Sequence, residues 1–215
     1  MVRNLFRKRG SDTPRYYIYL SRTKVGMLYP QIPRHLVRSL EAEMKASIGV
    51  LQATVKGGKR PDDTDLYLQA AIVDQYMVRH DRVGTVNAPE RYVKDVATLK
   101  YGIVSEYAAD IAFFGGSVGE VKLGLIGSSD SMVGEPQRTE ARHGLFSYTL
   151  RFLSQAAESD TISAAGPPYY TYAEAYDIAL NATTSVEAKV EFLGRVLHSE
   201  PGLLIATPIY VVAAD

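Results

Sequence analysis

The sequence predicts an α+β fold in a single domain, with a mainly antiparallel, glycine-rich central sheet covered by three to four helices. The length of 215 residues, with 46% hydrophobic and 22% charged residues, suits one globular domain. Apolar residues alternate in several segments, as in strands, and recur at helical spacing in others. Six glycines lie among alternating apolar residues between positions 112 and 134: Gly115, Gly116, Gly119, Gly124, Gly127 and Gly134.

The first third of the chain alternates between strand and helix patterns. Arg15–Leu20 is rich in aromatic and β-branched residues and is predicted to be a strand. We expect Ser21–Pro33 to be an ordered connection, because Pro30 and Pro33 prevent a long helix. Apolar residues at helical spacing predict a helix over Arg34–Ala46.

A further strand and helix complete this part of the chain. Ile48–Val55 is predicted to be a strand that stops at Gly57-Gly58. A helix is expected to begin at Asp62 and end near His80, because acidic residues accept the free N–H groups of a helix N-terminus.

The centre of the chain predicts an antiparallel meander. Tyr92–Val104, Ala108–Phe114 and Val121–Ile126 have strand patterns, and Gly115–Glu120 is expected to be the hairpin connection between the last two. Glycine inside a strand costs stability. The glycines therefore indicate either turns with positive φ or backbone that closely approaches a ligand, a partner or another strand.

The last third is predicted to contain two helices and two strands. We expect helices over Arg138–Ala157 and Tyr172–Leu180. Val186–Phe192 alternates strictly and is predicted to be a strand with one solvated face. Leu203–Val212 is predicted to be the last strand, and Pro208 should place it at a sheet edge or at a bulge.

Charge is unevenly distributed although the formal net charge is zero. Residues 1–60 hold 13 Lys and Arg and 3 acidic residues, whereas residues 61–215 hold 11 basic and 21 acidic residues. We expect the two parts to complement each other in a domain that spans residues 14–215. Residues 1–13 are expected to be a flexible basic tail, whose basic residues are Arg3, Arg7, Lys8 and Arg9.

The sequence contains no recognisable catalytic or metal-binding motif. It has no cysteine, no phosphate-binding glycine motif and no nucleophile elbow, and its four histidines are isolated from one another. No apolar run approaches the roughly 20 residues of a membrane helix. We therefore expect a cytoplasmic protein without cofactor, metal or membrane contact, and we assign no catalytic residue.

Tyrosine is unusually frequent, with 15 residues and no tryptophan. Tyrosine is enriched at interfaces and in pockets. We expect a contact surface that joins Ser21–Pro33, Gly127–Ser131 and Tyr169–Tyr176. The candidate ligand-binding residues are Arg22, Lys24, Tyr29, Gly127, Ser128, Ser129, Tyr169, Tyr170 and Tyr172.

Three segments carry a resemblance to an uncharacterised bacterial family found mainly in actinomycetes. They are YYIYLSRTKVGMLYPQIP at Tyr16–Pro33, AFFGG and VKLGLIGS within Ala112–Ser128, and LLIATPIYVV at Leu203–Val212. The family has no established activity, so the resemblance transfers no catalytic residue. Related small domains resemble accessory components of bacterial signalling or conflict systems, which implies sensing or interaction.

These observations favour a non-enzymatic binding or regulatory module that recognises a small ligand or a protein partner. One alternative is an enzyme that acts on a phosphorylated or nucleotide-like substrate, with Arg22, Lys24 and the Gly127 loop binding the anion. A second alternative is nucleic-acid binding through the basic first quarter, against which the acidic remainder argues. Homo-oligomerisation is a further expectation, because an exposed sheet edge and many tyrosines suit a twofold contact.

Overall fold

The computed structural model describes residues 15–48, 61–80, 83–106, 109–134, 138–140, 171–183 and 186–214. Its helices are α1 (Arg22–Leu28), η1 (Tyr29–Gln31), α2 (Arg34–Ile48), α3 (Pro61–His80), η2 (Ser129–Ser131) and α5 (Tyr172–Ala182). Its strands are β1 (Tyr17–Leu20), β2 (Val83–Gly84), β3 (Tyr92–Glu106), β4 (Ala109–Val118), β5 (Val121–Ser128), β6 (Arg138–Glu140), β7 (Glu187–Glu200) and β8 (Leu203–Ala213).

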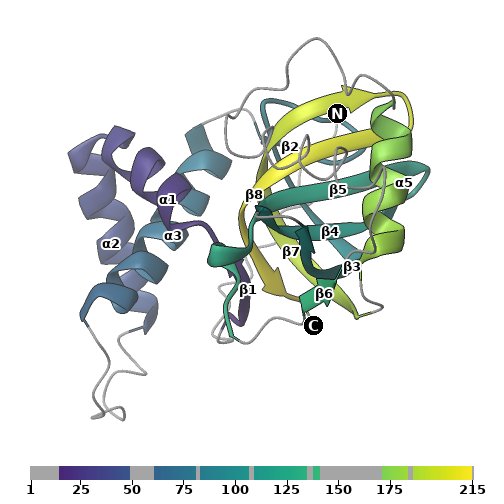
Figure 1. The fold of residues 1–215 in the computed structure, drawn as a ribbon. Coiled ribbons are helices and arrows are strands. Elements are labelled where there is room, and N and C mark those ends of the chain that lie inside the picture. The colour runs from purple at the N-terminus through teal and green to yellow at the C-terminus, as the bar shows by residue number, and fades with distance from the viewer. Residues whose placement is uncertain are drawn as a thin grey trace.

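The α+β class is confirmed, but the sheet is a closed barrel rather than an open meander. The predicted meander exists, because β4 pairs antiparallel with both β3 and β5. β7 then pairs antiparallel with β3 and β8, and β8 pairs parallel with β5, which closes a five-stranded ring. α1, α2 and α3 lie together on one side of this barrel, and α5 lies on the opposite side (Figure 1). Closure depends on the length of β7, which continues well past the predicted end at Phe192.

Of the two positions predicted for Pro208, a sheet edge or a bulge, the structure shows the bulge. Pro208 pairs with Gly194 of β7, whereas Tyr210 pairs with Leu193, so Ile209 is the extra residue. β8 also changes its other neighbour here, from β5 before the proline to β1 after it. Proline lacks an N–H group and cannot donate a hydrogen bond to a neighbouring strand. At the bulge the hydrogen-bond ladder is interrupted, so proline is tolerated there.

Three apolar clusters hold these layers together. The barrel interior is filled, and its largest fully buried side chains include Tyr19, Phe114, Phe192, Leu99 and Leu125. A second cluster joins α1–α3 to the outer face of β1, β7 and β8, and includes Val25, Ile72, Val73, Leu193 and Tyr210. The third lies under α5 and includes Phe113, Ala175, Tyr176 and Ile205.

The glycine-rich block serves packing within the protein. β4 continues to Val118, so Gly115 and Gly116 are strand residues and the expected Gly115–Glu120 connection shrinks to a turn at Gly119, whose φ is 61°. A Cβ on Gly115 would lie 2.8 Å from the Leu180 side chain of α5, and one on Gly116 would lie 2.6 Å from a backbone oxygen of β3. Of the alternatives that the glycine pattern left open, close approach to neighbouring protein segments therefore explains these two positions.

Three other expected elements differ from the structure. Ser21–Pro33 contains α1 and η1, because Pro30 limits helix length without excluding a short helix. Ile48 ends α2, and the rest of the predicted strand Ile48–Val55 lies outside the described residues. Arg138–Glu140 forms β6 beside β3 instead of starting a helix, and the remainder of that predicted helix also lies outside them.

Gly26 provides a stability test within α1. A Cβ built on it meets nothing within 4 Å, so alanine fits there without displacing a neighbour. We expect Gly26→Ala to raise the free energy of unfolding by about 0.4–1 kcal/mol, because alanine restricts the unfolded chain and favours helix. Urea denaturation measures the change, and destabilisation would contradict the open environment of this position.

Candidate ligand-binding pocket

The helical side of the candidate pocket is built by α1 and η1. The hydroxyl of Ser21 caps α1 by accepting a hydrogen bond from the Lys24 N–H at 3.3 Å, and the Ser21 N–H donates to the Ile209 carbonyl of β8 at 2.9 Å. Val25 is completely buried and fixes the inner face of the helix. The first turn of α1, which carries Lys24, is therefore held beside the outer face of the barrel.

The barrel side comes from the start of β3 and the middle of β7. Tyr92 pairs directly with Arg195, so their side chains leave the same face of the sheet. Arg91 precedes β3, and its carbonyl accepts a hydrogen bond from the Val196 N–H at 3.0 Å. The Arg91 guanidinium lies 5.5 Å from the centre of the Tyr92 ring, which is a cation–π distance.

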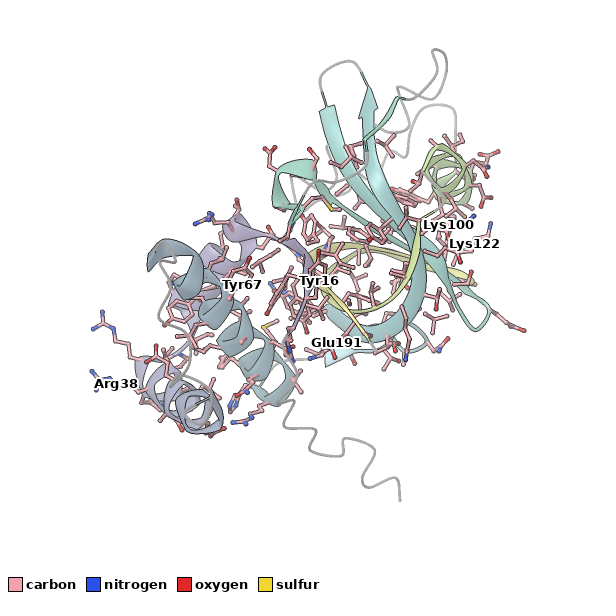
Figure 2. All side chains as sticks on the ribbon, turned by 90° about the horizontal axis from the view of Figure 1, so that it is seen from below. Tyr16, Arg38, Tyr67, Lys100, Lys122 and Glu191 are labelled. Atoms are coloured by element: carbon pink, nitrogen blue, oxygen red, sulfur yellow. The ribbon has the colours of Figure 1, made fainter. Side chains whose placement is uncertain are left out.

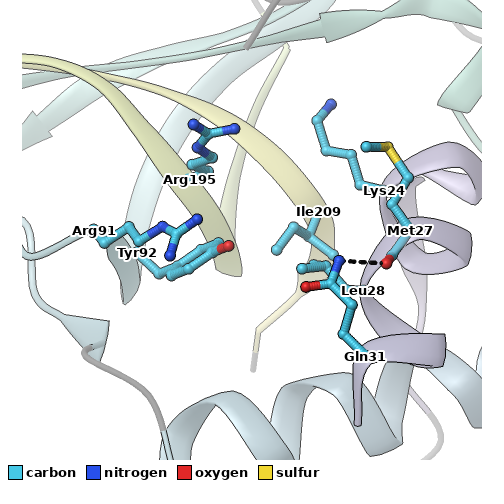
Figure 3. Close-up of a pocket in the computed structure, with 8 residues that line it drawn as sticks. All are labelled: Lys24, Met27, Leu28, Gln31, Arg91, Tyr92, Arg195 and Ile209. Carbon is cyan, nitrogen blue, oxygen red and sulfur yellow. Dashed lines mark hydrogen bonds between the residues drawn. The ribbon is translucent and has the colours of Figure 1, made fainter. Parts of the chain in front are cut away.

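A cavity of about 190 Å³ lies between these two sides (Figure 3). It is lined by Lys24, Met27, Leu28, Gln31, Arg91, Tyr92, Arg195 and Ile209. Three cationic side chains from α1, the β3 entry and β7 thus border one space, whereas these eight residues include no carboxylate. Like charges that border a concave surface focus a positive potential into it. The cavity is therefore suited to an anion.

A second cavity of about 150 Å³ adjoins the first. The two share Leu28, Gln31, Arg91 and Tyr92. Beyond them the second cavity is lined by Ile32, which follows η1, and by Val73, Tyr76 and Met77 of α3. A molecule that occupies the first cavity can therefore extend between the helices and the barrel.

Of the candidate ligand-binding residues that the structure describes, only Lys24 lies in the lining of these cavities. Arg22 lies on the exposed side of α1, and the Tyr29 hydroxyl donates to Glu41 of α2 at 3.3 Å. Tyr172, at the start of α5, stacks on His198 with ring centres 3.9 Å apart. Tyr169 and Tyr170 lie outside the described residues.

The Gly127–Ser131 segment has local structural roles. Gly127 packs against Tyr19 of β1, where a Cβ would overlap the phenol. The Ser128 hydroxyl caps η2 by accepting from the Asp130 N–H at 3.3 Å, and Ser129 is buried. The structure thus does not bring this segment into the described lining of either cavity, in contrast to the single contact surface that we expected from the sequence.

Arg91 and Arg195 are the residues that the sequence did not reveal. They are about one hundred positions apart, and Arg195 follows the predicted end of its strand. Their proximity results from the pairing of β3 with β7, which closes the barrel. The strict alternation ends at Phe192 because Leu193 follows it directly, so no local pattern signalled that β7 continues to Arg195.

A separate group of charged residues joins α3 to the barrel. Asp74, buried on α3, lies 2.6 Å from Lys94 Nζ and 3.5 Å from Arg15 Nη1. The Tyr210 hydroxyl lies 2.9 Å from Asp74 Oδ1 and 3.0 Å from Glu191 Oε1, so it shares its proton between two carboxylates. Burial, together with these two negative charges, raises the pKa of Tyr210 well above its ordinary value. We interpret this group as a structural connection because its central atoms are inaccessible.

The described residues show neither a cluster of metal ligands nor a helix suited to span a membrane. They contain no group of three or more acidic or histidine side chains arranged to hold a metal ion. None of the helices within the described ranges combines the length and the apolar character that crossing a membrane requires.

A family model described as "Family of unknown function (DUF7019)" matches residues 15–215. No curated protein and no solved structure matches the chain.

Proposed function

The chain belongs to DUF7019, a family of unknown function, and we propose from its pocket that it is a non-enzymatic binding module for a small anionic ligand. The convergence of Lys24, Arg91 and Arg195 on one cavity carries this proposal. Arginine and lysine bind carboxylate and phosphate oxygens through charge-assisted hydrogen bonds, and arginine can form two at once. A bound anion would bridge α1 to the barrel.

The composition of the lining supports binding rather than turnover. General acid–base or nucleophilic chemistry requires a suitable group within hydrogen-bond reach of a reacting atom. The described residues that line the two cavities include no carboxylate, imidazole, serine or threonine. Lys24 and the phenols of Tyr76 and Tyr92 are the titratable groups available there besides arginine. Binding of an anion uses Lys24, Arg91 and Arg195 and requires no general acid, general base or nucleophile.

We expect phosphate, sulfate or citrate to raise the melting temperature of the protein. A ligand at 100 times its Kd adds about 2.7 kcal/mol of stability, which corresponds to roughly 5–10 °C for a chain of this size. Arg195→Gln should weaken binding roughly tenfold or more, because a hydrogen bond to a charged group contributes about 1.5–3 kcal/mol. Thermal unfolding and calorimetric titration measure both effects.

The matched control is Arg38→Gln on α2. Arg38 points away from the protein and lines neither cavity (Figure 2). Phosphate and sulfate also stabilise proteins by exclusion from their surface, so the decisive quantity is the difference between the two variants. Equal anion affinity in Arg195→Gln and Arg38→Gln, with both variants folded, would refute the pocket as the anion site.

A further inference from the structure

The size of the two adjoining cavities indicates more than an inorganic ion. Pockets for small organic ligands usually measure about 300–1,000 Å³. Neither the cavity of about 190 Å³ nor its neighbour of about 150 Å³ reaches this range alone. The two cavities share four lining residues, so a ligand that reaches both would have more space than either cavity offers alone. The ligand should therefore have two parts, of which one is anionic.

The charge of the first cavity favours a phosphate monoester for the anionic part. Two guanidinium groups and one ammonium group line this cavity. A phosphate monoester carries about −1.5 to −2 charges near neutral pH and has three strong acceptor oxygens, whereas a carboxylate carries a single charge. The planar forks of Arg91 and Arg195 match the geometry of phosphate oxygens, and Lys24 adds a point charge.

The second cavity favours a flat ring with polar groups at its edge. Tyr76 lines this cavity with a half-buried aromatic ring, and Tyr92 and Met77, which are almost fully buried, complete the apolar part of the wall. The Gln31 amide nitrogen donates to the Met27 carbonyl at 2.7 Å, and its amide oxygen points toward Arg91 and Tyr92 across the cavity (Figure 3). This oxygen can accept a hydrogen bond from an amino or hydroxyl group of a ligand.

We propose that the ligand is a nucleoside monophosphate, with its phosphate between Lys24, Arg91 and Arg195 and its base in the cavity beside Tyr76 and Gln31. The proposal rests on the anion-binding function proposed above. It adds that the ring contributes to affinity together with the phosphate. Aromatic side chains stack on every base because each base has a π-face, so the structure assigns the class and not the individual base.

Calorimetric titration of the full chain tests the proposal with inorganic phosphate, ribose 5-phosphate, adenosine and the four 5′-ribonucleoside monophosphates. At least one monophosphate should bind roughly 100-fold more tightly than inorganic phosphate, because stacking adds to the charge interaction. Tyr76→Leu should lower the affinity for that nucleotide roughly tenfold, which is the loss typical of removing one stacking aromatic side chain. The affinity for inorganic phosphate should not change. Arg195→Gln should lower the affinity for both the nucleotide and inorganic phosphate.

Two further variants control for folding and location. Gln31→Ala removes the side-chain amide at an exposed position, so it does not disturb the packing of α3. We expect it to lower the affinity for the nucleotide and not the affinity for inorganic phosphate. Tyr16→Leu removes a tyrosine that is 69% exposed and lines neither cavity, so nucleotide affinity should not change.

The outcomes separate this proposal from the previous one. If inorganic phosphate binds through Arg195 and no nucleotide binds more tightly, the nucleoside assignment is wrong and the anion pocket stands. Ribose 5-phosphate binding as tightly as the best nucleotide would also overturn the assignment, because the base would then contribute nothing. If neither phosphate nor nucleotide binds, both proposals fail.

Discussion

Replacing Asp74 by alanine is expected to lower the free energy of unfolding by about 3–5 kcal/mol, the cost typical of breaking a buried ion pair. The Asp74 side chain is only 6% exposed, and it contacts both Lys94 and Arg15. Its removal leaves these two cations with Glu191 as the one remaining carboxylate of the group. The cost arises mainly from charge left in a poorly solvated place.

Asp74→Asn separates charge from shape at the same position. The amide retains an acceptor for the Tyr210 hydroxyl but supplies no charge to Lys94. We expect urea denaturation at neutral pH to show a loss for Asp74→Asn comparable to that for Asp74→Ala if charge dominates. A clearly smaller loss would show that the shape and hydrogen bonds of the side chain matter more.

The control lies on the same layer of helices. Glu43 of α2 forms an ion pair with Arg79 of α3 at 2.8 Å, and both side chains are about half exposed. Exposed pairs contribute about 0–1 kcal/mol, so Glu43→Ala should have a small effect. Equal effects of Glu43→Ala and Asp74→Ala would contradict the structural role that we assign to the buried group.

Local sequence patterns predicted individual helices and strands, but they did not predict how the strands pair. Helical spacing identified α2 and α3, and alternation identified β3. The helix α5 and the strand β8 were also predicted close to their bounds, with Pro208 at a sheet edge or at a bulge. Barrel closure was not predictable in this way. It depends on β7 pairing with β3 and β8, and on β8 pairing with β5, and no alternation pattern within one strand specifies which distant strand is its partner.

The pocket illustrates the same limit. Lys24 was singled out as a basic residue of the Ser21–Pro33 connection that could bind an anion, and the structure places it in the cavity lining. Arg91 and Arg195 looked like ordinary strand-end residues, since only the β3–β7 register brings them together. The Gly127–Ser131 segment was predicted to contribute to the site but does not line either cavity. Glycine and serine in a loop are typical of anion sites as well as of turns, so the sequence did not distinguish the two roles.

Gly127→Ala is expected to lower the free energy of unfolding by about 1–3 kcal/mol or more, the cost of overpacking a filled core. A Cβ at this position would overlap the Tyr19 hydroxyl oxygen and lie 2.7 Å from the ring carbon Cζ. Tyr19 is fully buried in the barrel interior, where its ring packs edge-on against Phe114 at 5.9 Å. The phenol therefore has little room to move aside.

A double-mutant cycle with Tyr19→Phe tests whether this contact is the cause. Phenylalanine removes the nearest oxygen and leaves the ring in place, so Gly127→Ala should cost less in the Tyr19→Phe background. Neighbouring residues that share a contact typically show coupling of about 0.5–3 kcal/mol, and the sign here should favour the double variant. Additive effects measured by urea denaturation would mean that alanine disturbs something other than Tyr19.

Gly26→Ala is the matched control for the backbone contribution, because both variants add one methyl group. On α1 that methyl group meets open space, whereas on β5 it meets the phenol. Opposite signs for the two substitutions would show that the barrel interior, rather than glycine flexibility, requires glycine at position 127. This outcome would also argue against a ligand-binding role for Gly127, because a glycine needed to seat Tyr19 has no vacant surface to offer a ligand.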